Sequence, residues 1–260
     1  MIRRACAFVA AGALLAGCAS SGSKSGSSKG SDDAALKGAA VVFAAASLKP
    51  TFTELAKQFD AAHPGVKVVL SFGGSDSLAA QIKQGAPVDV FASANTATMQ
   101  AVVSSDDARS PVNFAKNELE IAVAPGNPRH IAALRDVTAS GVKLALCAPS
   151  VPCGSAAEKA FAAASLEPHP VTLEQDVTSV LTKVELGEAD AGLVYRTDVK
   201  AAGGRVAGVD FTQAAEAVNT YPIAQVTTGK NPSVGKAFVS FVLSAEGQTV
   251  LRAAGFEPAA

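Results

Sequence analysis

The chain has few aromatic residues and no tryptophan. Of its 260 residues, 5% are aromatic and only two are tyrosine. Proteins that hold sugars or nucleobases by stacking need exposed aromatic rings, so this composition argues against a large flat ligand. Hydrophobic residues make up 48% of the chain, with many alanines, which favours an α/β protein.

The chain also lacks an excess of charge of either sign. Lys and Arg total 22 against 23 Asp and Glu, which gives a formal net charge of -1. Such a balance provides no general attraction to nucleic acid or to an anionic membrane surface. We therefore expect no nucleic-acid partner and no basic groove.

Motifs of several enzyme classes are absent. The sequence contains no G-x-S-x-G and no H-E-x-x-H, and its histidines at 63, 130 and 169 are scattered. An S-x-x-K pattern at residues 21–24 lies in a low-complexity segment, and "GKNPSVGKA" lacks the spacing and the Ser/Thr of a phosphate-binding loop. A secreted hydrolase is therefore a remote alternative, as is a purely structural lipoprotein.

The N-terminus is typical of an exported lipoprotein. Arg3 and Arg4 precede an apolar stretch at residues 5–16, which is too short to span a bilayer. The stretch leads into "LAGC", which resembles the lipobox of bacterial lipoproteins, in which the cysteine becomes the lipidated first residue. We predict a signal peptide over residues 1–18 and lipidation at Cys18. The alternative is a chance cysteine after an ordinary signal peptide.

The segment after Cys18 is rich in serine and glycine. "ASSGSKSGSSKGSDD", residues 19–33, has too few apolar residues to pack into a core. We expect residues 19–38 to form a flexible tether that reaches roughly 25 Å from the membrane, with the folded part beginning near Lys37. The protein is accordingly predicted to be extracytoplasmic and lipid-anchored to the cell membrane.

Export also bears on the four cysteines of the chain. Cys6 would be removed with the signal peptide and Cys18 would carry lipid, which leaves Cys147 and Cys153. In an oxidising compartment this pair, six apart across "CAPSVPC", is expected to form a disulfide that rigidifies the loop. Buried free thiols are the alternative. Metal ligation by the pair is the least favoured hypothesis, because no histidine or further cysteine lies near.

Beyond the tether, β-type and helical segments alternate, with no internal repeat. Apolar or β-rich runs predict strands at residues 41–46, 66–72, 88–92, 119–124, 142–147, 189–195 and 221–227. Helical patterns lie between them, at residues 48–62, 76–84, 96–103, 155–165, 177–186, 233–243 and 245–253. The alternation predicts an α/β fold with parallel or mixed sheets that helices cover on both faces.

Several of these helices begin with small or neutral residues. Ser47 lies where a strand is followed by a helix, and Ser75 follows "FGG" at the same kind of junction. Cys153 comes just before a helix, and Val177 follows Asp176, a predicted N-cap. Ligands of α/β proteins sit beyond the carboxyl ends of strands, where helix N-termini present free NH groups. Because no Lys or Arg enters these turns, they indicate a site built from NH groups and hydroxyls, although Ser47 alone reads more simply as an N-cap.

At this point the residues resemble a known family. "VVFAAASL", "SFGGSDSLAAQI", "PSVPCGSA", "DVTSVLTKVELGEADAGLVY" and the closing "AAGFEP" are similar, in order and spacing, to the molybdate-binding proteins of bacterial ABC transporters, over residues 41–257. The resemblance implies a solute-binding protein that captures molybdate or tungstate for a membrane permease and its ATPase. We expect a monomer that is not an enzyme and that has neither a cofactor nor a bare metal ion.

The resemblance also implies a periplasmic-binding-protein fold. In this fold two α/β lobes, joined by a hinge of crossing strands, hold the ligand between them and close around it. The crossings would fall near residues 117–119 and 218–223. Lobe one would then comprise residues 39–118 and 222–260, and lobe two residues 119–221.

By motif, the resemblance implies an oxyanion-binding set of five residues. Ser47 and Ser75 would each offer a hydroxyl and a backbone NH from lobe one. Cys153 and Val177 would offer backbone NH groups from lobe two, and Tyr195 would offer its phenol. Some family members have alanine where Cys153 stands, which matters little for a backbone contact.

Asp76 is the more serious departure from the family pattern, because molybdate, tungstate and sulfate are dianions that carry only acceptors. We expect the Asp76 side chain to point outward, where the helix dipole favours a carboxylate. An inward carboxylate would repel a dianion but would accept the proton that phosphate retains. The alternative ligands are therefore sulfate, phosphate or another tetrahedral oxyanion.

Overall fold

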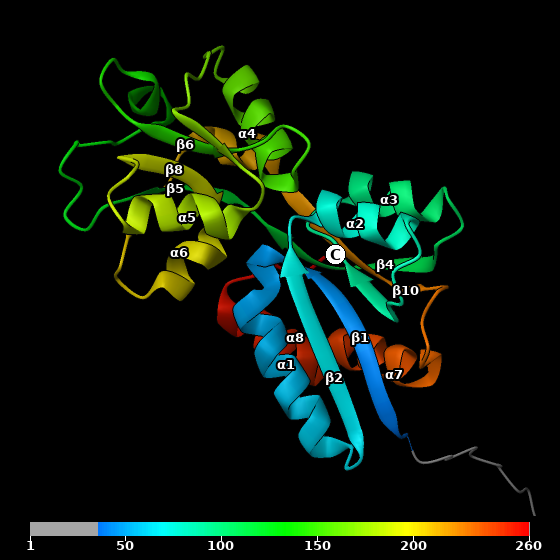
Figure 1. Ribbon diagram of the computed structural model, residues 1–260. Helices are drawn as coiled ribbons and strands as arrows, with labels where there is room; N and C mark the ends of the chain where they lie inside the picture. Colours follow the sequence, from blue (N-terminus) through cyan, green and yellow to red (C-terminus); the bar gives the residue numbers. More distant parts are fainter. Residues whose placement is uncertain (1–35, 260) are drawn as a thin grey trace, which may run out of the picture. The chain divides into compact units, whose positions relative to one another are not determined.

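The computed structural model describes residues 36–259 of the chain. The predicted signal peptide, Cys18 and nearly all of the predicted tether lie outside the described residues. None of the helices within residues 36–259 combines the length and the apolar character that crossing a membrane requires. Two mixed five-stranded sheets, with helices packed on them, make up this part of the chain (Figure 1).

The first sheet has the strand order β2-β1-β3-β10-β4. Its strands are β1 (Gly38–Ala45), β2 (Val66–Gly73), β3 (Val90–Ala92), β4 (Ala108–Asn117) and β10 (Asn219–Val226). β1 is parallel to both β2 and β3, whereas β10 is antiparallel to β3 and β4. The carboxyl ends of β1, β2 and β3 therefore meet at one edge of the sheet.

Helices cover both faces of the first sheet. They are α1 (Lys49–Ala62), α2 (Ser75–Lys83), α3 (Thr96–Val103), α7 (Pro232–Leu243) and α8 (Ala245–Ala254). On one face, Phe52 and Phe59 of α1 pack with Phe238 of α7 in a single apolar core. On the other face, Ile82 of α2 and Met99 of α3 lie in a separate core. The apolar spacing within α1 explains why one stripe of that helix is buried.

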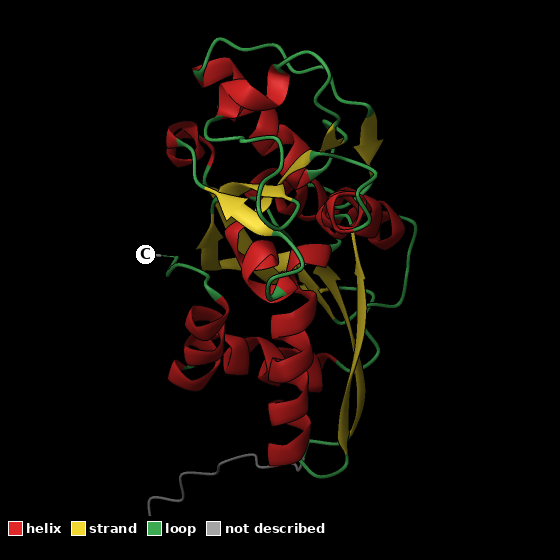
Figure 2. Cartoon of the chain, turned by 90° about the vertical axis from the view of Figure 1, so that its left-hand side faces the viewer, coloured by secondary structure: helices red, strands yellow, loops and turns green. Residues whose placement is uncertain are grey.

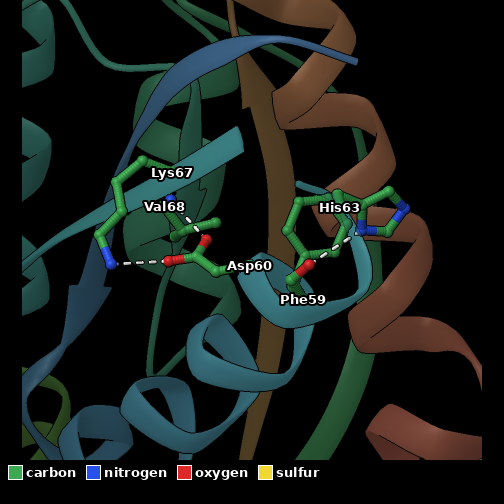
Figure 3. A network of polar contacts seen from close by, with 5 residues as sticks. All are labelled: Phe59, Asp60, His63, Lys67 and Val68. Carbon is green, nitrogen blue, oxygen red and sulfur yellow. Dashed lines mark hydrogen bonds and ion pairs between the residues drawn. The ribbon is translucent and has the colours of Figure 1, made fainter. Parts of the chain in front are cut away.

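The end of α1 is tied to the start of β2, beside which it runs (Figures 1 and 2). Asp60 Oδ1 accepts a hydrogen bond from the Val68 backbone NH at 2.9 Å, and Asp60 Oδ2 forms an ion pair with Lys67 Nζ at 2.7 Å (Figure 3). The His63 ring nitrogen Nδ1 lies 2.9 Å from the Phe59 carbonyl. The two contacts of Asp60 fix the C-terminal end of α1 on the sheet, and the His63 contact closes the last turn of the helix.

The second sheet has the strand order β7-β6-β8-β5-β9. Its strands are β5 (Leu119–Val123), β6 (Leu144–Cys147), β7 (Thr172–Glu174), β8 (Ala191–Tyr195) and β9 (Ala207–Val209). Its helices are α4 (Pro152–Ala163), α5 (Val177–Glu185) and α6 (Arg196–Ala202), with short 3-10 turns η2 (Leu134–Thr138) and η3 (Thr212–Ala217). Gly192 lets α5 pack against β8, because a Cβ there would lie 2.7 Å from Val180.

The chain passes between the two sheets twice. It leaves the first sheet after Asn117 of β4 and enters the second at Leu119 of β5, and it returns to the first sheet at Asn219 of β10. The predicted α/β class with mixed sheets is confirmed. The residues at which the two predicted lobes divide stay a prediction.

Most predicted elements are present, with shifted ends, and a few were missed. The helix predicted at residues 96–103 has those bounds, and Asp176 is the N-cap of α5, as predicted. The helix predicted to begin at residue 155 begins at Pro152, so Cys153 lies inside its first turn and not before it. The missed strands and α-helix are β4, β7, β9 and α6, and the 3-10 turns η2 and η3 were missed as well. β4 is polar and contains Pro111, so it shows neither a continuous apolar run nor a regular alternation.

Candidate functional site

A small cavity collects residues from both sheets. It is narrow, because the centre of a water-sized sphere can occupy only about 10 Å³ of it, and it is partly open to solvent. On the first-sheet side it is lined by the turns that follow β1, β2 and β3, and on the second-sheet side by the starts of α4 and α5 and the end of β8. The structure brings all five sequence-predicted residues to this cavity: Ser47, Ser75, Cys153, Val177 and Tyr195.

The lining carries no cationic side chain. None of its residues is Lys, Arg or His, and its carboxylate is that of Asp176. Asp176 Oδ1 accepts a hydrogen bond from the Ser179 NH at 2.9 Å, and Oδ2 accepts one from the Ser179 hydroxyl at 3.0 Å. The Asp176 carboxylate is therefore engaged by the first turn of α5. An anion in the cavity would be met by neutral donors.

The first turns of α2, α4 and α5 supply backbone NH groups at the cavity. The opening NH groups of a helix have no partner within it, and the helix dipole makes this end favourable for an anion. No side chain caps α2 or α4. Gly154 allows the start of α4 to pack tightly, because a Cβ there would lie 1.9 Å from the Ala148 carbonyl oxygen.

Ser47 differs from the simple N-cap that the sequence also allowed. It lies in a 3-10 turn, η1 (Ala46–Leu48), and the N-cap of α1 is Leu48 with no side-chain capping bond. The buried Ser47 hydroxyl lies 3.0 Å from the hydroxyl of Tyr221 on β10. Ser75 is the first residue of α2, and its hydroxyl accepts a hydrogen bond from the Ala94 NH at 3.0 Å. Each serine hydroxyl is thus held by a second segment of the first sheet.

Tyr195 is held from the first sheet as well. The side-chain amide of Asn219 on β10 donates to the Tyr195 hydroxyl, and also to the Pro152 carbonyl at 3.2 Å. The Tyr195 and Tyr221 rings meet edge to face with centroids 6.0 Å apart. Burial raises the pKa of the Tyr195 phenol well above its ordinary value, so the phenol keeps its proton at neutral pH. It can therefore act as a hydrogen-bond donor to an anion.

Asp198, which the sequence analysis did not identify, holds the backbone of Tyr195. Its Oδ2 accepts a hydrogen bond from the Tyr195 backbone NH at 2.9 Å. Burial raises the Asp198 pKa to about 7, a rise that the NH bond from Tyr195 limits and the nearby Asp176 charge increases. An acidic residue at the third position of a helix is a known capping pattern, but Tyr195 at the N-cap hid it. The sequence around Asn219 and Tyr221 shows no motif that would identify them as residues of the site.

Cys147 and Cys153 form a disulfide with Cα atoms 5.7 Å apart. Cys147 is the last residue of β6, and Cys153 lies in the first turn of α4 and lines the cavity. The bond therefore ties a cavity-lining backbone segment to the second sheet. Both cysteines are buried.

Asp76 does not line the cavity. Its carboxylate Oδ2 accepts a hydrogen bond from the Ser150 hydroxyl at 3.2 Å, across from the turn that precedes α4. Within residues 36–259 its Oδ1 is buried without a hydrogen-bond partner. The carboxylate therefore lies outside the cavity lining and contacts the second sheet, through a bond with Ser150 that was not foreseen.

Comparisons with known proteins identify the family and the fold of the chain. Residues 40–257 match the family described as bacterial extracellular solute-binding proteins. The molybdate-binding protein ModA of Mycobacterium tuberculosis is 43% identical over 244 residues, which cover 94% of each chain.

Two solved structures share the fold at lower sequence identity. The periplasmic molybdate-binding protein of Azotobacter vinelandii matches with a TM-score of 0.74 at 21% identity, covering 84% of this chain and 98% of that one. The sulfate-binding protein SubI of M. tuberculosis matches with a TM-score of 0.74 at 19% identity, covering 85% and 86%. The fold is that of the periplasmic binding proteins, and the chain belongs to the family of bacterial extracellular solute-binding proteins.

Proposed function

We propose that this protein captures molybdate, and tungstate, outside the cytoplasm and delivers it to an ABC transporter. The similarity to the mycobacterial molybdate-binding protein, which extends over nearly the whole chain, supports this function. The observation that carries the proposal is the cavity itself. Donors from five separate segments line it, and no cationic side chain does.

In this proposal the five predicted residues hold the anion as neutral donors. Ser47 and Ser75 each give a hydroxyl and a backbone NH, Cys153 and Val177 each give a backbone NH, and Tyr195 gives its phenol. Hydrogen bonds to a charged group contribute roughly 1.5–3 kcal/mol each, so about seven would sum to roughly 10–20 kcal/mol before the cost of immobilisation. A nanomolar dissociation constant requires about 12 kcal/mol. An arginine is therefore not needed for tight binding.

The remaining parts of the proposal concern the setting of the site. Lobe one (residues 39–118 and 222–260) and lobe two (residues 119–221) would close on the anion. Lipidation of Cys18 would anchor the protein to the membrane through the tether. A monomer would then present the loaded cavity to the permease and ATPase subunits, with no catalytic step.

Sulfate is the second candidate ligand. The likeness in fold to a sulfate-binding protein favours it, and sulfate is also a tetrahedral dianion that only accepts hydrogen bonds. Phosphate retains a proton near neutral pH and would need an acceptor in the cavity. The Asp176 carboxylate is engaged by Ser179, and Asp76 does not line the cavity. The site therefore suits phosphate less well.

Calorimetric titration of the purified chain with molybdate, tungstate, sulfate and phosphate tests the function. We expect tight binding of molybdate and tungstate, weak binding of sulfate and none of phosphate. Tighter binding of sulfate than of molybdate would replace the proposed ligand, and tighter binding of phosphate would show that a carboxylate reaches the anion.

A further inference from the structure

A hydrogen bond between Asp76 and Ser150 spans the rim of the cavity. Asp76 is the second residue of α2, which packs on the first sheet, and Ser150 lies in the turn between β6 and α4 of the second sheet. The Ser150 hydroxyl donates to Asp76 Oδ2 at 3.2 Å. Each residue directly adjoins a residue that lines the cavity, Ser75 and Val151.

A second close approach joins the two sheets at the same place. Gly74, the N-cap of α2, lies so near the segment before α5 that a Cβ on it would be 2.3 Å from the Gln175 carbonyl oxygen. The backbone before α2 and the backbone before α5 therefore touch beside the Asp76–Ser150 bond.

The Asp76 carboxylate is unusual for a residue beside an anion site. Its Oδ1 is buried with no hydrogen-bond partner among residues 36–259, which is a costly arrangement for a carboxylate oxygen. That same oxygen would lie 2.8 Å from a Cβ at Gly74, next to the cavity. A carboxylate so placed brings no benefit to anion binding, but its position lets the other oxygen reach across to Ser150.

We propose that the Asp76–Ser150 hydrogen bond is a latch that holds the starts of α2 and α4 together and slows release of the bound oxyanion. This inference rests on the proposed function of the same cavity. Asp76 and Ser150 are positioning residues, since neither lines the cavity. The latch forms only when the two helix starts are close, so it stabilises the closed arrangement over any arrangement in which they separate.

The test compares release rates in the full chain. Protein loaded with radiolabelled molybdate is chased with an excess of unlabelled molybdate, and the label retained is followed with time. For Ser150→Ala we expect release to be faster by about threefold to tenfold, the range for one solvent-exposed hydrogen bond. Asp76→Ala loses the same bond but also removes a negative charge near the anion, so its release should quicken less. The double variant should release no faster than the faster single variant, because both changes remove the same bond.

Ser105→Ala is the matched control. The Ser105 hydroxyl also donates to a carboxylate, that of Asp107 at 2.7 Å, but in the turn between α3 and β4. Its release rate should equal that of the unaltered chain. Thermal melting of each variant, followed by circular dichroism, checks that the fold is retained.

Association gives a second readout. The chain has two tyrosines and no tryptophan, and both tyrosines, Tyr195 and Tyr221, lie in the network at the cavity. Tyrosine fluorescence in a stopped-flow instrument therefore reports capture of molybdate. Ser150→Ala should leave the association rate unchanged, because the latch closes after the anion has arrived.

Two results would overturn the latch. One is a release rate of Ser150→Ala within about twofold of the unaltered chain, and the other is a double variant in which the two single effects multiply. Should the unaltered chain retain sulfate and not molybdate, the proposed ligand fails, and the same variants compared with labelled sulfate still decide the latch. A chain that retains neither anion would overturn both proposals.

Discussion

Asn219 on β10 donates a hydrogen bond to the hydroxyl of Tyr195 at the end of β8. The same amide nitrogen donates to the carbonyl of Pro152, in the first turn of α4, at 3.2 Å. One buried side chain of the first sheet therefore positions two residues of the second sheet that line the cavity. Because an NH₂ group can only donate, the Tyr195 hydroxyl accepts here and retains its own proton for another acceptor.

Removing the Tyr195 hydroxyl tests whether it binds the anion. We expect Tyr195→Phe to weaken molybdate binding by about 1–3 kcal/mol, the contribution of one hydrogen bond to a charged ligand. Tyr221→Phe is the matched control, since its hydroxyl contacts Ser47 but does not line the cavity, and it should weaken binding less. Calorimetry gives both values. A larger loss for Tyr221→Phe would mean that the wrong phenol has been assigned.

Neighbouring glycines at the end of β2 test whether the two sheets must approach each other at the cavity. A Cβ at Gly74 would lie 2.3 Å from the Gln175 carbonyl oxygen, whereas at Gly73 the nearest atom, on Leu78, would be 3.7 Å away. We expect Gly74→Ala to weaken molybdate binding by about tenfold or more, because the overlap costs about 1–3 kcal/mol. Gly73→Ala should bind nearly as well as the unaltered chain. Equal affinities for the two variants would show that the approach is not needed.

The buried Asp198 should make stability depend on pH. Its folded-state pKa of about 7 lies above the ordinary value of 3.8 because burial disfavours the charged form. Its stabilising contribution is therefore present below pH 4 and is lost as the pH rises towards 7. Asp198→Asn keeps an oxygen for the Tyr195 NH and removes this titration. We expect the stability of the variant relative to the unaltered chain to rise by about 1.4 kcal/mol per pH unit between pH 5 and 7.

Denaturant unfolding at several pH values measures this difference. If Asp198 ionises in the folded state without a cost, the difference in unfolding free energy between the two proteins will stay constant with pH. In that case the burial of Asp198 would not control its titration.

The disulfide should affect both stability and ligand binding. Replacing Cys147 and Cys153 together by alanine removes a short closed loop, which we expect to cost about 2 kcal/mol of unfolding free energy. Because Cys153 also lines the cavity, molybdate affinity should fall as well. Treatment of the unaltered chain with a reductant should reproduce both effects, and thiol labelling confirms that reduction has occurred. Unchanged affinity after complete reduction would mean that packing alone holds the start of α4.

The sequence was informative where function depends on local pattern. Asp176 as N-cap of α5 and the helix at residues 96–103 were both predictable, because capping residues and helical periodicity are read within a few positions. The five cavity residues each lie at a junction between a strand and a helix or in the first turn of a helix. Their gathering at one cavity followed from the family resemblance and not from any one junction.

Contacts between distant segments were beyond such reasoning. Ser47 and Tyr221 are 174 positions apart, and Asp76 and Ser150 are 74 apart. Such pairs depend on how the sheets are packed, which periodicity does not reveal. β4 was not predicted for a different reason: much of the strand is exposed, and its pairing with β10 contains register shifts. Its polar sequence therefore shows no strand alternation.

A crystal of the chain grown with molybdate, measured at the molybdenum absorption edge, would locate the anion directly. We expect a single strong anomalous peak in the cavity, within contact distance of Ser47, Ser75, Cys153, Val177 and Tyr195 and away from any Lys or Arg. A peak coordinated by lysine or arginine side chains elsewhere on the surface, with none in the cavity, would contradict binding by neutral donors.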